Sequence, residues 1–319
     1  MLLLTEQDVQ DLLPMSRAIE CVTASFRAQH GVAINRSRER IFLPETSLHY
    51  MAAGYPHEKL LGMKIYTVSS DALRFLVLLY DGESGSLLAV IEADHLGRIR
   101  TGAASGVATQ YLARPGASRA GVIGTGRQAR TQLEAVAAAR SLRRARVFSR
   151  DTVRREAYAR EMTRKLGLEV EAVSSAEAAV RGSDIVITAT SSRGPVLQGE
   201  WLELGTHVNA IGANMLNRRE LDDESLSRAA LIAVDSIEQA KEEAGDLVHG
   251  LQATGGDWDS VIEMHDIVAG ARPGRKSATD ITIFKSSGIA LWDVGSAGYI
   301  YQQALVEGKG RRIPMWAES

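Results

Sequence analysis

The chain has very little cysteine. Cys21 is the single thiol among its 319 residues, so no disulfide can form within the chain. A lack of disulfides is typical of proteins from reducing compartments, and we therefore expect a cytoplasmic protein. Cys21 lies in an apolar pattern with helical spacing, which favours a buried, unreactive thiol over a catalytic nucleophile.

A long apolar run and a strong excess of one charge are also missing. The longest apolar run, around residues 75–80, is far too short to span a lipid bilayer. The formal net charge is -2, which leaves no strong positive field to attract nucleic acid or a membrane surface. We expect neither as a partner.

The motifs of metal-dependent and hydrolytic enzymes are absent as well. The sequence has no HExxH, no paired CxxC and no histidine–carboxylate cluster at metal-ligand spacing, so we expect no metal. It also lacks the GxSxG elbow of many hydrolases. Its composition, 45% hydrophobic and 24% charged, is that of a globular protein, and its length is typical of two domains.

The first third of the sequence predicts a helix followed by a small sheet. Residues 14–31 place apolar side chains at helical spacing between a proline and a glycine. From residue 41 to 91 the pattern changes to short apolar stretches, with DGESG at 81–85 as a hairpin turn. Asp94 can cap a helix that runs to about Leu112, and the sequence Arg-Pro-Gly at 114–116 then breaks the pattern.

After this break, strands and helices alternate. Apolar strands are indicated at 119–124, 144–149, 168–173, 184–190, 207–212, 230–234 and 281–285, with helices at 127–140 and 151–166. This alternation predicts βαβ units on a parallel sheet with right-handed crossovers, which is an α/β fold. The amphipathic stretch 288–308 would close this domain and return to the first one.

The strongest local signal is GVIGTGRQA at 121–129, which follows an apolar strand and opens a helix. In its G-x-G-x-x-A core, Gly124 permits a tight turn, Gly126 lets the backbone approach a pyrophosphate, and Ala129 allows close packing of helix on strand. The free N–H groups of the helix start would attract the anion. The motif predicts a dinucleotide site.

The end of the next strand discriminates between the two nicotinamide dinucleotides. An acidic residue there would bond the adenine ribose of NAD(H), but this chain has Ser149 and Arg150, with Asp151 one step later. Because Arg150 can pair with a 2′-phosphate, we expect NADP(H) to be preferred. The alternative is that Arg150 only stacks on the adenine and NAD(H) binds.

Together these and further motifs resemble those of the ornithine cyclodeaminase/mu-crystallin family. They cover nearly the whole chain: LGMKIYT, DGESGSLLAVIEA, RIRTGAASGVATQYLARP, GVIGTGRQA, DIVITATSS, HVNAIGAN followed by RREL, and DITIFKSSGIALWDV. RTGAASGVAT joined to GVIGTGRQA is the most specific part. The family includes ornithine and lysine cyclodeaminases, alanine dehydrogenases, and reductases of cyclic or linear imino acids.

The resemblance implies the domain organisation and the assembly. It predicts a Rossmann dinucleotide-binding domain, placed here at residues 115–297. A discontinuous α+β domain, placed at 1–114 with 298–319, would bind the substrate and build a homodimer.

The resemblance also implies three basic residues at the substrate. The lysine of the family's G-x-K motif matches Lys64, and the arginine of its R-T-[GA]-A motif matches Arg100. For a further upstream arginine, Arg38 fits the spacing best, with Arg36 and Arg40 as alternatives. Two arginines can hold the carboxylate of an amino or imino acid. A lysine with a lowered pKa can exchange a proton with the substrate or hydrogen-bond its carboxylate.

One position departs from the family pattern. Cyclodeaminases of the family carry an aspartate after the strand on the nicotinamide side, where this chain has Asn214. Asparagine cannot take a proton, which counts against cyclodeamination, but it can hydrogen-bond a substrate amine or imine. We therefore expect NAD(P)H-dependent reduction of a small imino acid such as 1-pyrroline-2-carboxylate, or the reverse amino-acid dehydrogenation. The alternatives are an ornithine cyclodeaminase and a non-enzymatic protein that binds NADPH or another ligand.

The remaining expected contacts are with the cofactor. Three hydroxyl residues at 190–192 follow the fourth strand, beside the expected nicotinamide edge, and Ser286 follows a later strand; the alternative is that these hydroxyls cap turns. The full set of expected cofactor contacts is Gly124, Thr125, Gly126, Arg127, Gln128, Ala129, Ser149, Arg150, Thr190, Ser191, Ser192, Ile211 and Ser286.

Overall fold

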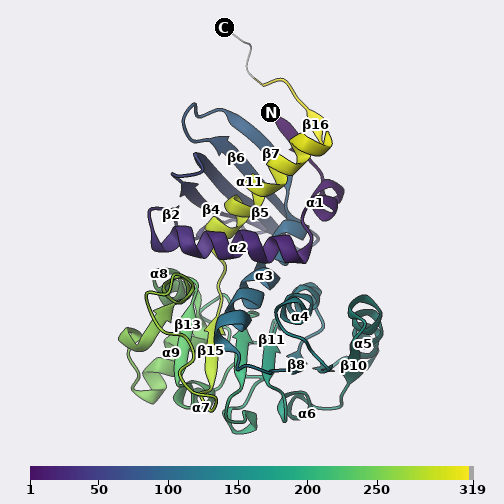
Figure 1. Cartoon of the computed structure of the whole chain (residues 1–319), viewed down its shortest axis with the longest axis vertical. Helices are drawn as coiled ribbons and strands as arrows, with labels where there is room; N and C mark the ends of the chain where they lie inside the picture. Colours follow the sequence, from purple (N-terminus) through teal and green to yellow (C-terminus); the bar gives the residue numbers. More distant parts are fainter. Residues whose placement is uncertain (316–319) are drawn as a thin grey trace. The chain divides into compact units, whose positions relative to one another are not determined.

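The computed structural model describes residues 1–315, which divide into two units (Figure 1). Unit 1 comprises residues 1–100 and the segment from Gly288 onward, and unit 2 comprises residues 101–287. The expected boundaries at 114/115 and 297/298 thus lie in unit 2 and unit 1, respectively. The chain changes unit inside helix α3, Asp94–Leu112, because the second half of this helix packs closely within unit 2. A Cβ on Gly102 would lie only 2.4 Å from the carbonyl oxygen of Thr131.

Unit 1 is built on a mixed sheet in the order β16-β1-β7-β6-β5-β4-β2, with β3 paired to β4. Its strands are β1 Leu2–Leu4, β2 Ile34–Asn35, β3 Glu39–Phe42, β4 Thr46–Tyr55, β5 Leu60–Ser69, β6 Leu73–Asp81, β7 Leu87–Glu92 and β16 Arg311–Arg312. Its helices are α1 Glu6–Leu12, α2 Met15–His30, the start of α3, and α11 Ala290–Glu307. The expected helix, sheet and hairpin turn are confirmed, whereas β1, β16 and α1 were not predicted from the pattern.

Helix α11 packs across β4 and β5, and α2 packs on α11 (Figure 1). The approach of α11 to β5 is so close that a Cβ on Gly62 would lie 2.7 Å from a methyl carbon of Val294. The rings of Phe26 and Trp292 meet edge to face with their centroids 5.3 Å apart, which is a favourable aromatic geometry. These contacts fix the first turn of α11 over the centre of the sheet.

Unit 2 is built on a parallel sheet in the order β10-β9-β8-β11-β12-β15-β13-β14. Its strands are β8 Arg119–Ile123, β9 Arg144–Phe148, β10 Glu169–Ala172, β11 Ile185–Thr188, β12 His207–Ala210, β13 Leu231–Val234, β14 Val261–Glu263 and β15 Thr282–Lys285. Its helices are α4 Arg127–Ala139, α5 Thr152–Leu166, α6 Ala176–Val180, α7 Asp223–Ser227, α8 Ile237–Glu243, α9 Gly245–Thr254 and α10 Met264–Val268, with single 3₁₀ turns η1 Gly199–Trp201 and η2 Trp258–Ser260. The predicted α/β fold is confirmed.

Both faces of this parallel sheet are covered by helices. Along β11, Ile185 and Ile187 belong to a buried cluster that includes Leu133 of α4 and Met162 of α5. Val186, which points the other way, belongs to a second cluster with residues of α7, α8 and α9. The chain runs outward from β8 through β9 to β10 on one side and from β11 on the other. Doubly wound sheets bind ligands at the carboxyl ends of the strands where the order reverses, which is here between β8 and β11.

None of the helices within residues 1–315 is both long and apolar enough to cross a membrane.

Candidate functional site

The glycine-rich loop leaves β8 in a backbone conformation that only glycine adopts easily. Gly124 has φ +113°, and a Cβ there would lie 2.4 Å from the carbonyl oxygen of Ala189 at the end of β11. Gly126 is the N-cap of α4; it is exposed and has no side chain with which to cap the helix. Ala129 is fully buried where α4 meets the sheet. The loop therefore presents a helix N-terminus and unobstructed backbone, which suits a pyrophosphate.

Side-chain hydrogen bonds hold this loop in place. Arg130 Nη1 donates to the carbonyl oxygen of Thr125 at 2.8 Å and to that of Gly126 at 3.1 Å, while its Nε is paired with Glu161. Thr125 Oγ1 donates to Ser149 Oγ at 3.2 Å, which connects the loop to the end of β9. Gln128 is half-buried, and Arg127 is exposed beside the helix start.

At the end of β9, the acidic residue is already engaged. Asp151 is the N-cap of α5, where it accepts the backbone N–H of Arg154 at 3.0 Å. Its Oδ2 also lies 3.3 Å from Arg154 Nε. Arg150 is exposed and has no hydrogen bond or ion pair from its side chain within residues 1–315. A free guanidinium with the neighbouring carboxylate committed elsewhere favours an anion at this position.

The strand ends β11, β12 and β15 carry the other expected cofactor residues. After β11, Ser192 Oγ donates to the carbonyl oxygen of Gly194 at 2.7 Å, Thr190 Oγ1 accepts the N–H of Ser192 at 3.2 Å, and Ser191 is exposed. Ile211, after β12, is buried. These hydroxyls stabilise the local turn, as the alternative interpretation of the sequence allowed.

Ser286 and Asn214 follow β15 and β12. Ser286 is buried after β15 and donates through its hydroxyl to Asp235 Oδ2 at 2.9 Å. Asn214 is half-buried in the loop after β12. β12 and β15 are parallel neighbours, so both residues lie at the same edge of the sheet.

A buried ionic group that sequence reasoning did not identify ties these strand ends together. Glu220 accepts hydrogen bonds from Thr188 Oγ1, from the N–H of Thr190 and from the N–H of Gly212, at 2.6–2.8 Å. Lys285 Nζ lies 3.1 Å from Asp246 Oδ2 and donates to the carbonyl of Ala213. Burial raises the pKa of Glu220, the positive charge of Lys285 lowers it, and Asp246 raises it. The buried side chains of Glu220 and Lys285 thus hold the backbone of the loops after β11 and β12 in place.

The three expected substrate residues come together in unit 1. Lys64 lies at the middle of β5, Arg100 lies on α3, and Arg38 directly precedes β3; their exposed fractions are 4%, 4% and 8%. Lys64 Nζ is 5.2 Å from the ring centre of Phe75, and the guanidinium of Arg100 is 5.5 Å from that of Trp292. Arg36, in contrast, is exposed and Arg40 is half-buried, so of the three arginines Arg38 is the buried one.

A carboxylate that the sequence did not single out joins two of these cations. Asp293 of α11 is fully buried, and its Oδ1 accepts hydrogen bonds from Lys64 Nζ at 2.9 Å and from Arg100 Nε at 3.0 Å. Arg38 Nη2 donates to the carbonyl oxygen of Gly288 at 3.4 Å. The sequence held a signal for Asp293, because it stands between the apolar residues Trp292 and Val294, and a carboxylate buried among apolar residues needs a partner.

The environment of Lys64 brings its pKa close to neutral. Burial is the largest cause and lowers the pKa, Arg100 lowers it further, Asp293 raises it, and Arg38 lowers it, so that the pKa falls to about 8. Arg100 Nη1 is buried and has no hydrogen-bond partner within residues 1–315. The unused donor of this guanidinium can hold a small carboxylate. The lysine beside it can exchange one proton with the molecule that the guanidinium holds.

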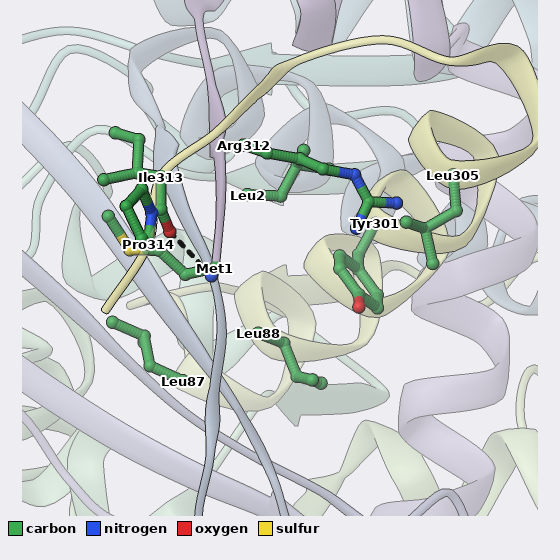
Figure 2. A pocket seen from close by; sticks show the side chains of 9 residues that line it. All are labelled: Met1, Leu2, Leu87, Leu88, Tyr301, Leu305, Arg312, Ile313 and Pro314. Atoms are coloured by element: carbon green, nitrogen blue, oxygen red, sulfur yellow. Dashed lines mark hydrogen bonds between the residues drawn. The ribbon is translucent and has the colours of Figure 1, made fainter. Parts of the chain in front are cut away.

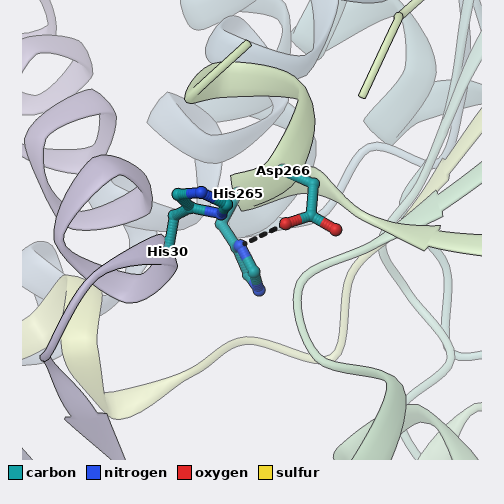
Figure 3. Close-up of side chains that lie close together, drawn as sticks. All are labelled: His30, His265 and Asp266. Atoms are coloured by element: carbon teal, nitrogen blue, oxygen red, sulfur yellow. Dashed lines mark ion pairs between the residues drawn. The ribbon is translucent and has the colours of Figure 1, made fainter. Parts of the chain in front are cut away.

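Two other features of the structure do not belong to this cluster. A hollow of about 440 Å³ in unit 1 is lined mostly by apolar side chains of β1, β7, α11 and the C-terminal segment, among them Leu2, Leu87 and Tyr301 (Figure 2). None of the expected site residues lines it. In unit 2, His265 lies 2.6 Å from Glu263 and 3.2 Å from Asp266. Figure 3 draws His265 with Asp266, and also His30 of unit 1.

Comparison with known proteins confirms the resemblance seen in the sequence. The family model described as "Ornithine cyclodeaminase/mu-crystallin family" matches residues 1–308. A Delta(1)-pyrroline-2-carboxylate reductase of Bacillus cereus is 32% identical over 98% of this chain and 99% of its own.

Two solved structures are similar over nearly their full length. The Delta(1)-pyrroline-2-carboxylate reductase of Thermococcus litoralis, in complex with NADH and L-proline, is 36% identical, covers 98% of this chain and 100% of its own, and gives a TM-score of 0.94. An archaeal alanine dehydrogenase dimer with bound NAD is 32% identical, covers 99% of both chains, and gives a TM-score of 0.93.

The two loop glycines are expected to respond differently to a methyl group. Gly124→Ala places a Cβ against Ala189 at a positive φ, so we expect a lower Tm together with loss of dinucleotide binding. Gly126→Ala meets no atom within 4 Å, so its Tm should match the unsubstituted protein while dinucleotide affinity falls about tenfold or more. Thermal denaturation and fluorescence titration with NADH and NADPH measure both effects. Unchanged affinity in Gly126→Ala would place the pyrophosphate elsewhere.

Proposed function

We propose that this chain, which belongs to the ornithine cyclodeaminase/mu-crystallin family, reduces small imino acids to L-amino acids with NAD(P)H and catalyses the reverse dehydrogenation. The observation that carries this proposal is the buried cluster of Lys64, Arg100 and Arg38, in which a lysine with a pKa of about 8 lies beside two guanidinium groups. The relatives named for pyrroline-2-carboxylate reduction support the substrate class.

The proposed substrate contacts follow from the chemistry of an imino acid. Its carboxylate accepts paired hydrogen bonds from Arg100, whose Nη1 is unused in unit 1, and from Arg38. Its nitrogen needs one proton as the double bond to carbon is reduced, and Lys64 Nζ donates that proton. The glycine-rich loop and the N-terminus of α4 would hold the dinucleotide, which when bound supplies the hydride.

The pKa of Lys64 predicts whether the rate of each reaction rises or falls with pH. Imine reduction needs the protonated lysine, so its rate should be highest below about pH 8 and fall above it. Amino-acid dehydrogenation needs the neutral lysine and should rise through the same pH. Asn214, which cannot exchange a proton, supports these single-proton reactions over the loss of ammonia in a cyclodeaminase.

The first test is consumption of NADPH or NADH with a panel of cyclic and linear imino acids, followed by nicotinamide absorbance. We expect rapid turnover with at least one of them. Lys64→Met should lower kcat about 10²- to 10⁴-fold with cofactor affinity unchanged, because it removes the proton donor. Lys59→Met, at an exposed lysine of the same unit, should have no effect.

Three other outcomes of this test would contradict the proposed reaction or the proposed role of Lys64. Ammonia release from ornithine and NAD, without consumption of reduced cofactor by any imino acid, would identify a cyclodeaminase. Dinucleotide binding without either reaction would identify a non-enzymatic binder. Full turnover by Lys64→Met would remove this lysine from the mechanism.

We propose further that NADPH is the preferred cofactor, although NADH is also a candidate and the solved relatives bind NADH or NAD. Arg150 supports this proposal, because it is exposed and lacks a side-chain partner within residues 1–315, while Asp151 is committed to the cap of α5. A ribose 2′-phosphate would give the guanidinium a charged partner.

Arg150→Ala should raise the KM for NADPH about tenfold and leave that for NADH unchanged, because only NADPH carries the 2′-phosphate. Arg160→Ala, at an exposed arginine within α5, serves as the control. Steady-state kinetics with both cofactors measure the effect. Equal losses with the two cofactors would show that Arg150 contacts the adenine instead.

A homodimer is the proposed assembly, supported by the dimeric archaeal relative and by one uncovered face of the first sheet. On β5 and β6, the residues that alternate away from α11 include a group of incompletely buried apolar side chains, Leu61, Met63, Ile65, Leu76 and Leu78. Leu61 and Leu76 are 49% and 38% exposed. An uncovered apolar sheet face of this kind marks an interaction surface.

Sedimentation equilibrium should give about twice the chain mass of 34.5 kDa at micromolar concentration. Leu76→Glu should shift the protein toward the monomer, because it buries a charge in the proposed interface. Val306→Glu, on the exposed side of α11, is the matched control and should leave the mass unchanged. A monomeric unsubstituted protein would contradict the proposal.

A further inference from the structure

Asp293 is the carboxylate that faces the cations of unit 1, and it has no part in the substrate contacts proposed above. It lies in the first turn of α11 with an exposed fraction of 0%. One oxygen, Oδ1, accepts both the hydrogen bond from Lys64 and that from Arg100, at 2.9 and 3.0 Å. The other oxygen, Oδ2, has no hydrogen-bond partner within residues 1–315. The two side chains that would act on the substrate are therefore joined through a single atom.

The position of this atom depends on close packing. A Cβ on Gly97 of α3 would lie 3.1 Å from Lys64 Nζ, and a Cβ on Gly288 would lie 2.8 Å from Arg100 Nη1. Gly288 also has φ +80°, which favours glycine. A side chain larger than glycine at position 97 or 288 would thus enter the space that the lysine or the arginine occupies. Within this space, the hydrogen bonds to the shared carboxylate oxygen fix the positions of the two charged groups.

The charges around Lys64 come from several elements. Arg100 from α3 and Arg38 from the segment before β3 are positive, and Asp293 from α11 is negative. The neighbouring strands present His49 from β4 and Phe75 from β6. His49 adds no charge at neutral pH, because burial, Arg40 and Arg38 lower its pKa to about 4. Without Asp293, a buried lysine would face two guanidinium groups and no counter-charge.

We propose that Asp293 is a positioning residue, which fixes Lys64 and Arg100 through one shared oxygen and keeps Lys64 charged until the substrate receives its proton. The kinetic part of this inference rests on the proposed reductase function. When an imino acid binds, its carboxylate adds a second negative charge to the cluster. The charges of the two arginines are then balanced, so that Lys64 can lose its proton to the substrate nitrogen without leaving an excess of buried negative charge.

The test compares the pH dependence of kcat/KM for imine reduction in variants of Asp293. In the unsubstituted protein the rate should fall above about pH 8. Asp293→Asn removes the charge that raises the pKa of Lys64, so the fall should move about one to three pH units lower. Asp293→Glu keeps the charge but displaces Arg100, so it should raise KM and leave the midpoint nearly unchanged. Asp11→Asn, at an exposed carboxylate paired with Lys309, should change neither.

A second readout does not need turnover. In protein labelled with ¹³C at lysine Cε, the resonance that disappears in Lys64→Met is that of Lys64, and its titration midpoint should be near 8. The midpoint should fall in Asp293→Asn, with Asp293→Ser as the second neutral variant if the first does not fold. An unchanged midpoint in the neutral variants, or an equal shift in Asp293→Glu, would overturn the inference. A shifted midpoint in a protein that reduces no imino acid would refute the proposed reaction and leave the role of Asp293 standing.

Discussion

Burial of positive charge is the constraint on which unit 1 depends. Three cationic side chains in an interior are costly unless counter-charge and hydrogen bonds accompany them, and Asp293 supplies one negative charge from α11. This requires the first turn of α11 to lie close to the middle of β5, where only glycine at position 62 leaves room for Val294. The edge-to-face contact of Phe26 with Trp292 holds the same turn from the side of α2. The cationic cluster therefore has its counter-charge only if α11 packs closely on the sheet.

Unit 2 also buries an ionic group, but its hydrogen bonding differs. The carboxylate of Glu220 accepts three hydrogen bonds, and Lys285 meets both a carboxylate and a backbone carbonyl. In unit 1 a cationic donor is left over, because Arg100 Nη1 has no hydrogen-bond partner within residues 1–315. Hydrogen bonds to the backbone stabilise the loops built on the group in unit 2, whereas the unused donor of Arg100 in unit 1 is available to a ligand.

The sequence predicted what local rules determine and missed what only tertiary contacts determine. The loop at Gly124 and Gly126 could be predicted because its backbone conformation and the following helix start are local requirements. Spacing favoured Arg38 but left Arg36 and Arg40 open, because only the folded segment shows which of the three arginines is buried. The partner of Lys64 could not be identified either, since Asp293 is 229 positions away. The strands β1 and β16 escaped prediction because two or three residues carry no periodicity, and their pairing with distant segments creates them.

The same electrostatic balance bears on which reaction this cluster favours. A lysine with a pKa of about 8 is partly protonated and partly neutral near neutral pH, so it can donate a proton to an imine or accept one from an amine. Loss of ammonia from a diamino acid needs a further group that handles protons at the leaving amine. Asp293 is committed to Lys64 and Arg100, and the position after β12 holds Asn214, which does not titrate. With a single proton-exchanging residue at hand, the cluster matches a reaction that moves one proton with one hydride.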